Sequence, residues 1–146
     1  MSVARVGFVG MRTERFTETV HLLRDVMGVP VEREGPDAVG FRMADGALLE
    51  VYGTEDEFHA FFTTGPVVGF EVDDFDRARA DMRAAGVRFL GAPQHDAGVS
   101  WQHFRSPDGT VCEIIGPGAV PVPGPAGDAG DGDGDGAGDG SGDGCG

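Results

Sequence analysis

Two glutamates stand at matching places in a sequence that repeats itself. Residues 41–53 read FRMADGALLEVYG and residues 104–116 read FRSPDGTVCEIIG, so Glu50 and Glu113 follow an Asp-Gly pair at the same spacing. In an alternating strand each glutamate shares its face with apolar neighbours, which is uncommon for a plain surface residue. A buried carboxylate needs an arginine or another cation as partner, because an unpaired buried charge is costly. Either a functional role inside a groove or pairing with an arginine on a nearby strand would explain the two glutamates; the candidate arginines are Arg12, Arg42 and Arg105.

His103 extends this constellation in the second copy. It precedes Glu113 on the neighbouring strand of an expected hairpin, and the tight turn at Asp108-Gly109 would bring both side chains onto one face. A histidine there could bind a metal, act as a general acid or base, donate a hydrogen bond to a substrate, or simply be a hydrogen-bonded wall residue.

Further side chains are expected to face the same groove and contact a ligand. Alternation along the strands selects Phe8, Arg12, Tyr52, Trp101 and Arg105. Aromatic surface beside carboxylates suits a planar or cationic small molecule. Gly10 and Gly69 match each other on the first strand of each copy, where a missing side chain would either leave room for a ligand or let the two sheets approach closely.

The elements that must position these residues come in two similar series. Short alternating or apolar stretches predict eight strands, at residues 6–12, 30–34, 38–43, 47–52, 67–72, 87–90, 99–105 and 110–115. Helical periodicity predicts helices over 14–27, with Thr13 as a possible N-cap, and over 75–85, and each helix is ended by a glycine. The predicted fold class is therefore α+β.

Each half of the chain reads as a βαβββ module. Module one covers residues 4–53, a link covers 54–66 and module two covers 67–116. The link contains His59 among three phenylalanines and is either a lid over the groove or an ordinary turn packed on the sheet. Two such modules placed edge to edge would form a cupped eight-stranded sheet around one groove.

The strand end FEVDD at residues 70–74 and the stretch SPDGTVCEIIG at residues 106–116 resemble the vicinal oxygen chelate superfamily. This superfamily includes glyoxalase I, extradiol dioxygenases, and the fosfomycin- and bleomycin-resistance proteins. The resemblance covers about residues 4–116. It implies the tandem βαβββ fold and, because relatives are often dimers, a homodimer.

The resemblance also implies roles for particular residues. Glu50 and Glu113 match the family's metal-ligating glutamates, but the His or Gln that the family takes from the first strand of each module is replaced by Phe8 and Val67. Neither replacement can bind a metal, and two carboxylates alone make a weak site for a divalent ion.

Two functional hypotheses follow, and whether the protein is an enzyme stays open between them. The first is a small-molecule-binding protein of the bleomycin-resistance type that works without a complete metal site. The second is a glyoxalase-like lyase, isomerase or dioxygenase in which Glu50 and Glu113, with His103, hold a divalent metal such as Ni, Zn, Mn or Fe. A weaker third hypothesis is an inactive relative that acts as an interaction subunit, with a groove filled by its own side chains.

Composition excludes several other classes. The formal net charge is −14, which disfavours nucleic acid and anionic membranes as partners. No apolar run approaches the length of a membrane span, no secretory signal is visible, and the two cysteines form no disulfide framework, so the cytoplasm is the expected location.

The last part of the sequence differs from the rest. Residues 117–146 are rich in Gly and Asp and contain no aromatic or basic residue, which predicts a disordered acidic tail. Its DGDGDG stretch at 131–136 copies the start of an EF-hand loop, but Gly142 stands where the closing glutamate is required, so we expect no calcium site.

Overall fold

The computed structural model describes residues 1–118. The tail predicted for 117–146 and its EF-hand-like stretch lie outside the described residues, except for Pro117 and Gly118. The elements follow one another as β1 (Val3–Arg12), α1 (Phe16–His21), the π-helical turn η1 (Leu22–Val26), β2 (Val31–Glu34), β3 (Ala38–Arg42), β4 (Leu48–Tyr52), β5 (Val67–Val72), α2 (Phe75–Ala84), β6 (Arg88–Asp96), β7 (Val99–Arg105) and β8 (Val111–Pro117).

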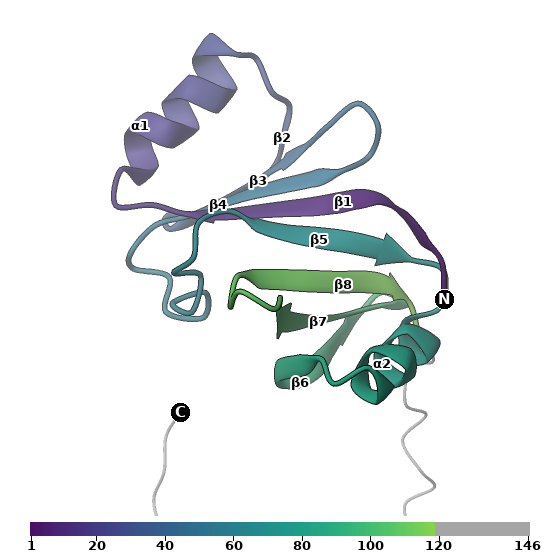
Figure 1. Cartoon of the computed structure of the whole chain (residues 1–146). Coiled ribbons are helices and arrows are strands. Elements are labelled where there is room, and N and C mark those ends of the chain that lie inside the picture. Colours follow the sequence, from purple (N-terminus) through teal and green to yellow (C-terminus); the bar gives the residue numbers. More distant parts are fainter. Residues whose placement is uncertain (119–146) are drawn as a thin grey trace, which may run out of the picture.

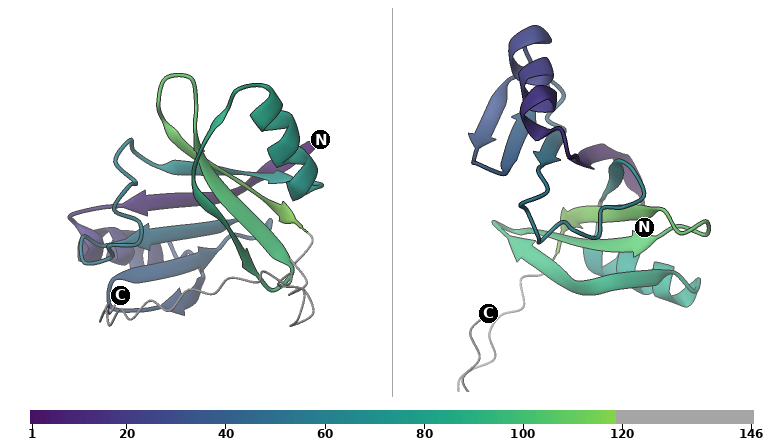
Figure 2. Two further views of the ribbon diagram at one scale, coloured as in Figure 1. Left: turned by 90° about the horizontal axis from the view of Figure 1, so that it is seen from below. Right: turned by 90° about the vertical axis from the view of Figure 1, so that its left-hand side faces the viewer.

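All eight strands join one sheet in the order β2-β3-β4-β1-β5-β8-β7-β6. The first strands of the two modules, β1 and β5, pair antiparallel at the centre, and each lies parallel to the last strand of its own module. Figure 1 shows β1 and β5 side by side, with α1 and α2 at opposite ends of the molecule. In the right-hand view of Figure 2, module one lies above module two. The predicted tandem βαβββ arrangement and α+β class are confirmed.

Three apolar clusters hold this arrangement together. In module one, Val20 and Leu23 pack with β3 and β4 residues, and in module two, Phe75 and Met82 pack with Val72 and Ile114. Each helix therefore covers one face of the sheet of its own module. The third cluster lies on the face that the helices leave bare, and its buried members are Phe8, Tyr52, Phe62, Val67 and Val111.

Helix one departs from its predicted range of 14–27. The α-helix begins at Phe16 and not at Glu14, and after His21 it continues as a wider π-helical turn. Thr13 does not cap the helix, although its hydroxyl accepts a hydrogen bond from the Arg15 amide at 3.0 Å. Gly28, with φ of 71°, ends the segment as expected because it can adopt the left-handed conformation.

Strand β6 is longer than the predicted strand over 87–90. The chain absorbs Gly91 and Pro93 in a bulge between Leu90 and Gln94 and continues as a strand to Asp96. The buried Gln102 side chain donates a hydrogen bond to the Gly91 carbonyl at 2.8 Å, which satisfies the backbone at the bulge. By contrast, β5 and β7 match their predicted ranges, and Asp74 caps α2 by accepting from the Arg77 amide.

Within residues 1–118, every helix is too short or too polar to cross a membrane.

Candidate functional site

A cavity of about 700 Å³ lies against the face of the sheet that the helices leave bare. Both modules and the link contribute to its wall. The lining residues are Phe8, Glu32, Arg33, Gly40, Arg42, Leu48, Glu50, Tyr52, Phe58, His59, Asp96, Ala97, Val99, Trp101, His103, Glu113 and Ile115. We call this cavity the groove.

Strand register explains why Glu50 and Glu113 both reach the groove. Glu50 on β4 lies opposite Gly10 on β1, and Glu113 on β8 lies opposite Gly69 on β5. The two glutamates therefore occupy equivalent places in the two modules, as the repeat predicts. On its other side, however, Glu50 faces Gly40, whereas Glu113 faces His103.

Glu113 and His103 form a buried pair on the floor of the groove. Nε2 of His103 lies 2.9 Å from Oε2 of Glu113, and the two residues expose only 8% and 4% of their surfaces. Nε2 nevertheless makes no hydrogen bond of good geometry among the described residues, so this is a close polar contact that lacks hydrogen-bond direction. Burial raises the pKa of the Glu113 carboxyl, His103 acts in the opposite sense, and the charge of Glu50 adds to the increase.

Glu50 has different partners from Glu113. Its Oε1 accepts from the Arg33 guanidinium at 3.2 Å, and its Oε2 accepts a short hydrogen bond from the Tyr52 hydroxyl. Burial and the neighbouring Glu50 carboxylate raise the pKa of Tyr52, so this hydroxyl keeps its proton. Arg33 lies beside Gly40 in the sheet, and the missing side chain there leaves Arg33 a path to Glu50.

The arginine partner was predicted wrongly. Arg33 was not among the expected candidates, and those candidates have other partners. Arg12 donates to the backbone carbonyls of Thr54 and Asp56, Arg42 pairs with Glu32 at 2.7 Å, and Arg105 donates to the Gly109 carbonyl.

Two residues predicted to contact a ligand lie outside the lining. Arg12 and Arg105 end β1 and β7, and their side chains donate to backbone carbonyls of the link and of the hairpin turn instead of entering the groove. Phe8, Tyr52 and Trp101 do line the groove, with Glu50, His103 and Glu113.

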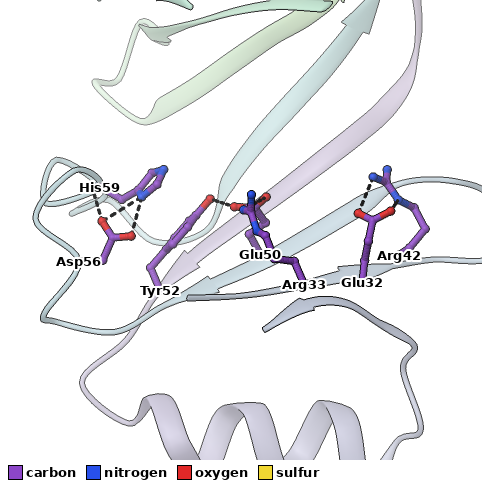
Figure 3. A network of polar contacts seen from close by, with 7 residues as sticks. All are labelled: Glu32, Arg33, Arg42, Glu50, Tyr52, Asp56 and His59. Atoms are coloured by element: carbon purple, nitrogen blue, oxygen red, sulfur yellow. Dashed lines mark hydrogen bonds and ion pairs between the residues drawn. The ribbon is translucent and has the colours of Figure 1, made fainter. Parts of the chain in front are cut away.

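The link supplies a residue that the sequence did not assign to the groove. The His59 ring stacks on Tyr52 with ring centroids 3.7 Å apart, and Asp56 holds its Nδ1 at 3.0 Å. Burial lowers the pKa of His59, although Asp56 acts against this, so the ring is neutral near pH 7. Figure 3 shows Tyr52, Glu50 and Arg33 following one another between the Asp56–His59 pair and the Glu32–Arg42 pair.

The remaining lining residues that we did not predict carry little sequence signal. Arg33 and Glu32 belong to a short strand exposed at every position, and Asp96 and Ala97 lie at a hairpin tip outside the predicted strands. Val99 begins a strand that we predicted, but we did not assign it to the groove. The aromatic run around His59 is the one signal that could have identified a groove residue in this set.

The structure shows what fills the space beside the matched glycines Gly10 and Gly69. A Cβ on Gly69 would lie 2.7 Å from Cβ of Phe8, and a Cβ on Gly10 would lie 2.7 Å from the Phe62 ring. The missing side chains therefore make room for the protein's own aromatic rings. Phe8 and Val67 are both buried in the cluster beneath the groove.

These residues do not fit a divalent metal. Phe8 and Val67 supply no donor atom, and the oxygens of Glu50 already accept from Arg33 and Tyr52. In the part of the chain that the structure describes, no three His, Cys, Asp or Glu side chains are grouped to hold a metal ion. The donor set therefore falls short of what a hard divalent cation requires.

Comparisons with known proteins agree with this architecture. The family model described as Glyoxalase/Bleomycin resistance protein/Dioxygenase superfamily matches residues 5–114. A search of the curated proteins found no match.

Solved structures share the fold at low sequence identity. Methylmalonyl-CoA epimerase from Mycobacterium tuberculosis aligns with a TM-score of 0.62 and 16% identity, over 79% of this chain and 89% of its own. The Mn(II)-bound glyoxalase from Novosphingobium aromaticivorans aligns with a TM-score of 0.62 and 21% identity, over 78% of this chain and 39% of its own. A glyoxalase/bleomycin resistance protein/dioxygenase superfamily member from Vibrio splendidus 12B01 aligns with a TM-score of 0.58 and 18% identity, over 77% of this chain and 97% of its own.

Proposed function

We propose that this chain, which belongs to the Glyoxalase/Bleomycin resistance protein/Dioxygenase superfamily, binds a small organic molecule in its groove without using a metal ion. The observation that carries this proposal is the filled floor of the groove. Phe8 and Val67 are only 6% and 0% exposed and stand where the resemblance implies metal ligands. Because Arg33 and Tyr52 already bind the oxygens of Glu50, the groove lining favours an organic ligand over a metal ion.

The wall of the groove supports a planar ligand. Phe8, Tyr52, Phe58, His59 and Trp101 all line it, and aromatic rings offer flat apolar surface to a flat partner. The volume of about 700 Å³ is within the usual range for pockets that hold small molecules. The same open volume argues against an interaction subunit whose groove is filled by its own side chains.

An enzyme of the family is the second candidate, and the buried Glu113–His103 pair favours it. A carboxyl with a raised pKa beside an imidazole can hold or transfer a proton to a bound molecule. Similar folds occur in an epimerase and a glyoxalase, so the fold can carry such chemistry. A homodimer and a cytoplasmic location remain predictions.

The test combines metal content with ligand binding. We would expose the purified full chain to Ni²⁺, Zn²⁺, Mn²⁺ or Fe²⁺, remove the excess, and measure bound metal by mass spectrometry. The Glu50→Ala/Glu113→Ala double variant is the control. We expect metal far below one ion per chain in both proteins, while planar aromatic molecules change the signal of Trp101, the one tryptophan in the sequence.

The opposite pattern would reject the proposal. About one metal ion per wild-type chain, lost in the double variant, would support the metal-dependent enzyme. A Trp101 signal that no planar molecule changes would remove the binding function.

A further inference from the structure

The two groove glutamates differ in how far their hydrogen bonding is satisfied. Glu50 accepts from Arg33 on one oxygen and from Tyr52 on the other. For Glu113, the contact with His103 is the one close polar contact within residues 1–118, and Nε2 of His103 has no hydrogen bond there. The floor of module two therefore holds a polar pair with unused hydrogen-bonding capacity.

Such a pair is uncommon in a buried place. A buried polar group without a hydrogen bond costs free energy, and nearly all such groups in folded proteins have a partner. Aromatic edges of Phe61 and Phe62 pack on the His103 ring, with centroids 4.9 and 5.4 Å away, and supply no strong acceptor. Nε2 of His103 is itself buried, so the group that a bound molecule can reach is the Glu113 carboxyl, which lines the groove and can take a hydrogen bond from a ligand.

Charge decides which chemical group suits this place. Burial raises the pKa of the Glu113 carboxyl, which favours its uncharged form at this place beside His103. Of the other carboxylates that line the groove, Glu50 is offset by Arg33 and Glu32 by Arg42, while Asp96 is exposed at the hairpin tip, where solvent screens its charge. A ligand cation would thus gain little here, whereas a hydroxyl can donate a hydrogen bond to a carboxyl oxygen of Glu113 or accept one from the protonated carboxyl.

We propose that the groove takes a neutral, planar molecule bearing a hydroxyl group, and that this hydroxyl binds to the Glu113 carboxyl. The inference rests on the proposed binding function and adds the class of ligand. The apolar body of the molecule lies between Phe8 and the aromatic wall that includes Trp101.

Matched probes test this assignment. 2-Naphthol carries the hydroxyl, 2-methoxynaphthalene has the same rings but no donor, and 2-naphthylmethylamine carries a cation. Each is titrated into the ¹⁵N-labelled full chain while the single indole N–H resonance of Trp101 is followed. We expect 2-naphthol to bind about tenfold more tightly than either other probe, the effect of one or two good hydrogen bonds.

Variants locate the preference on the floor pair. Glu113→Leu keeps the side-chain volume similar and should bring the two neutral probes to nearly equal affinity. Glu18→Leu is the control and should keep the preference, because Glu18 is exposed on α1, which covers the face of the sheet opposite the groove. If Glu113→Leu does not unfold cooperatively, Glu113→Met makes the same test.

Each outcome decides the question. Equal binding of the neutral probes to the wild type, or a preference that survives in Glu113→Leu, overturns the hydroxyl assignment while leaving the binding function intact. Tighter binding of the amine overturns it in favour of a cationic ligand. If no probe moves the Trp101 resonance, the binding function itself fails, and the assignment fails with it.

Discussion

Glu113 and Glu50 hold equivalent positions in the two modules, yet their environments differ. Glu113 is buried beside an imidazole, whereas Glu50 is half-buried and accepts from a guanidinium and a phenol. The difference arises at one strand position, where module two has His103 and module one has Gly40. The residue at this position on the third strand of each module, glycine or histidine, thus decides which partner its glutamate has.

The raised pKa of Glu113 predicts how stability depends on pH. Because burial raises this pKa above the ordinary value of 4.5, the folded state binds more protons than the unfolded state between 4.5 and the raised value. The contribution of Glu113 is fully present below pH 4.5 and is lost as the pH rises through the folded pKa. Urea unfolding from pH 4 upward should therefore show Glu113→Gln gaining stability relative to the wild type as the pH rises.

The exposed link residue Glu57 provides the control for this measurement. Glu57→Gln should follow the wild-type curve, because its side chain stays in water in both states. A stability difference between Glu113→Gln and the wild type that does not change with pH would show that Glu113 keeps its ordinary ionisation in the folded protein.

At the scale of elements, strand alternation predicted which face of the sheet a side chain occupies better than it predicted which groups that side chain contacts. It placed Glu50, Tyr52 and His103 on the groove side, and all three line the groove. It could not tell that Arg12, which lies beside Tyr52, donates to the link carbonyls of Thr54 and Asp56, since that contact depends on the path of the link. Nor could it find Arg33, whose contact with Glu50 depends on the empty position at Gly40 in the next strand.

The central strands β1 and β5 depend on glycine at specific positions. An added Cβ on Gly69 would meet Cβ of Phe8 at 2.7 Å, so Gly69→Ala must displace the β1 side chain or the backbone. We expect its free energy of unfolding to fall by about 1–3 kcal/mol, the usual cost of overpacking a core. Chemical denaturation followed by circular dichroism measures this difference.

Gly40→Ala is the matched control for this substitution. Gly40 is also buried in a strand of the groove, but an added Cβ would find its nearest neighbours at an ordinary 3.8 Å. Its stability should change by less than about 0.5 kcal/mol. Equal losses in the two variants would mean that strand glycines are needed for backbone reasons and not for the packing of Phe8.

For the whole molecule, the sequence repeat predicted the architecture, because two similar series of elements must bury two similar faces. The repeat could not show how the floor is filled. The rings of Phe8 and Phe62 occupy space opened by Gly10 and Gly69, and that packing joins residues from both modules and the link. The groove is consequently a property of the assembled chain, since neither module contains all of its wall.

This shared construction predicts that the two modules unfold together. The chain contains one tyrosine and one tryptophan, Tyr52 in module one and Trp101 in module two, so each module carries its own optical reporter. Because β1 and β5 pair along their length within one continuous sheet, breaking either module exposes the other. In urea, the second-derivative absorbance of Tyr52 and the fluorescence of Trp101 should change with the same midpoint. Two separate midpoints would instead mean that each helix-covered half is stable alone, and that the floor cluster adds little to the cooperativity of the fold.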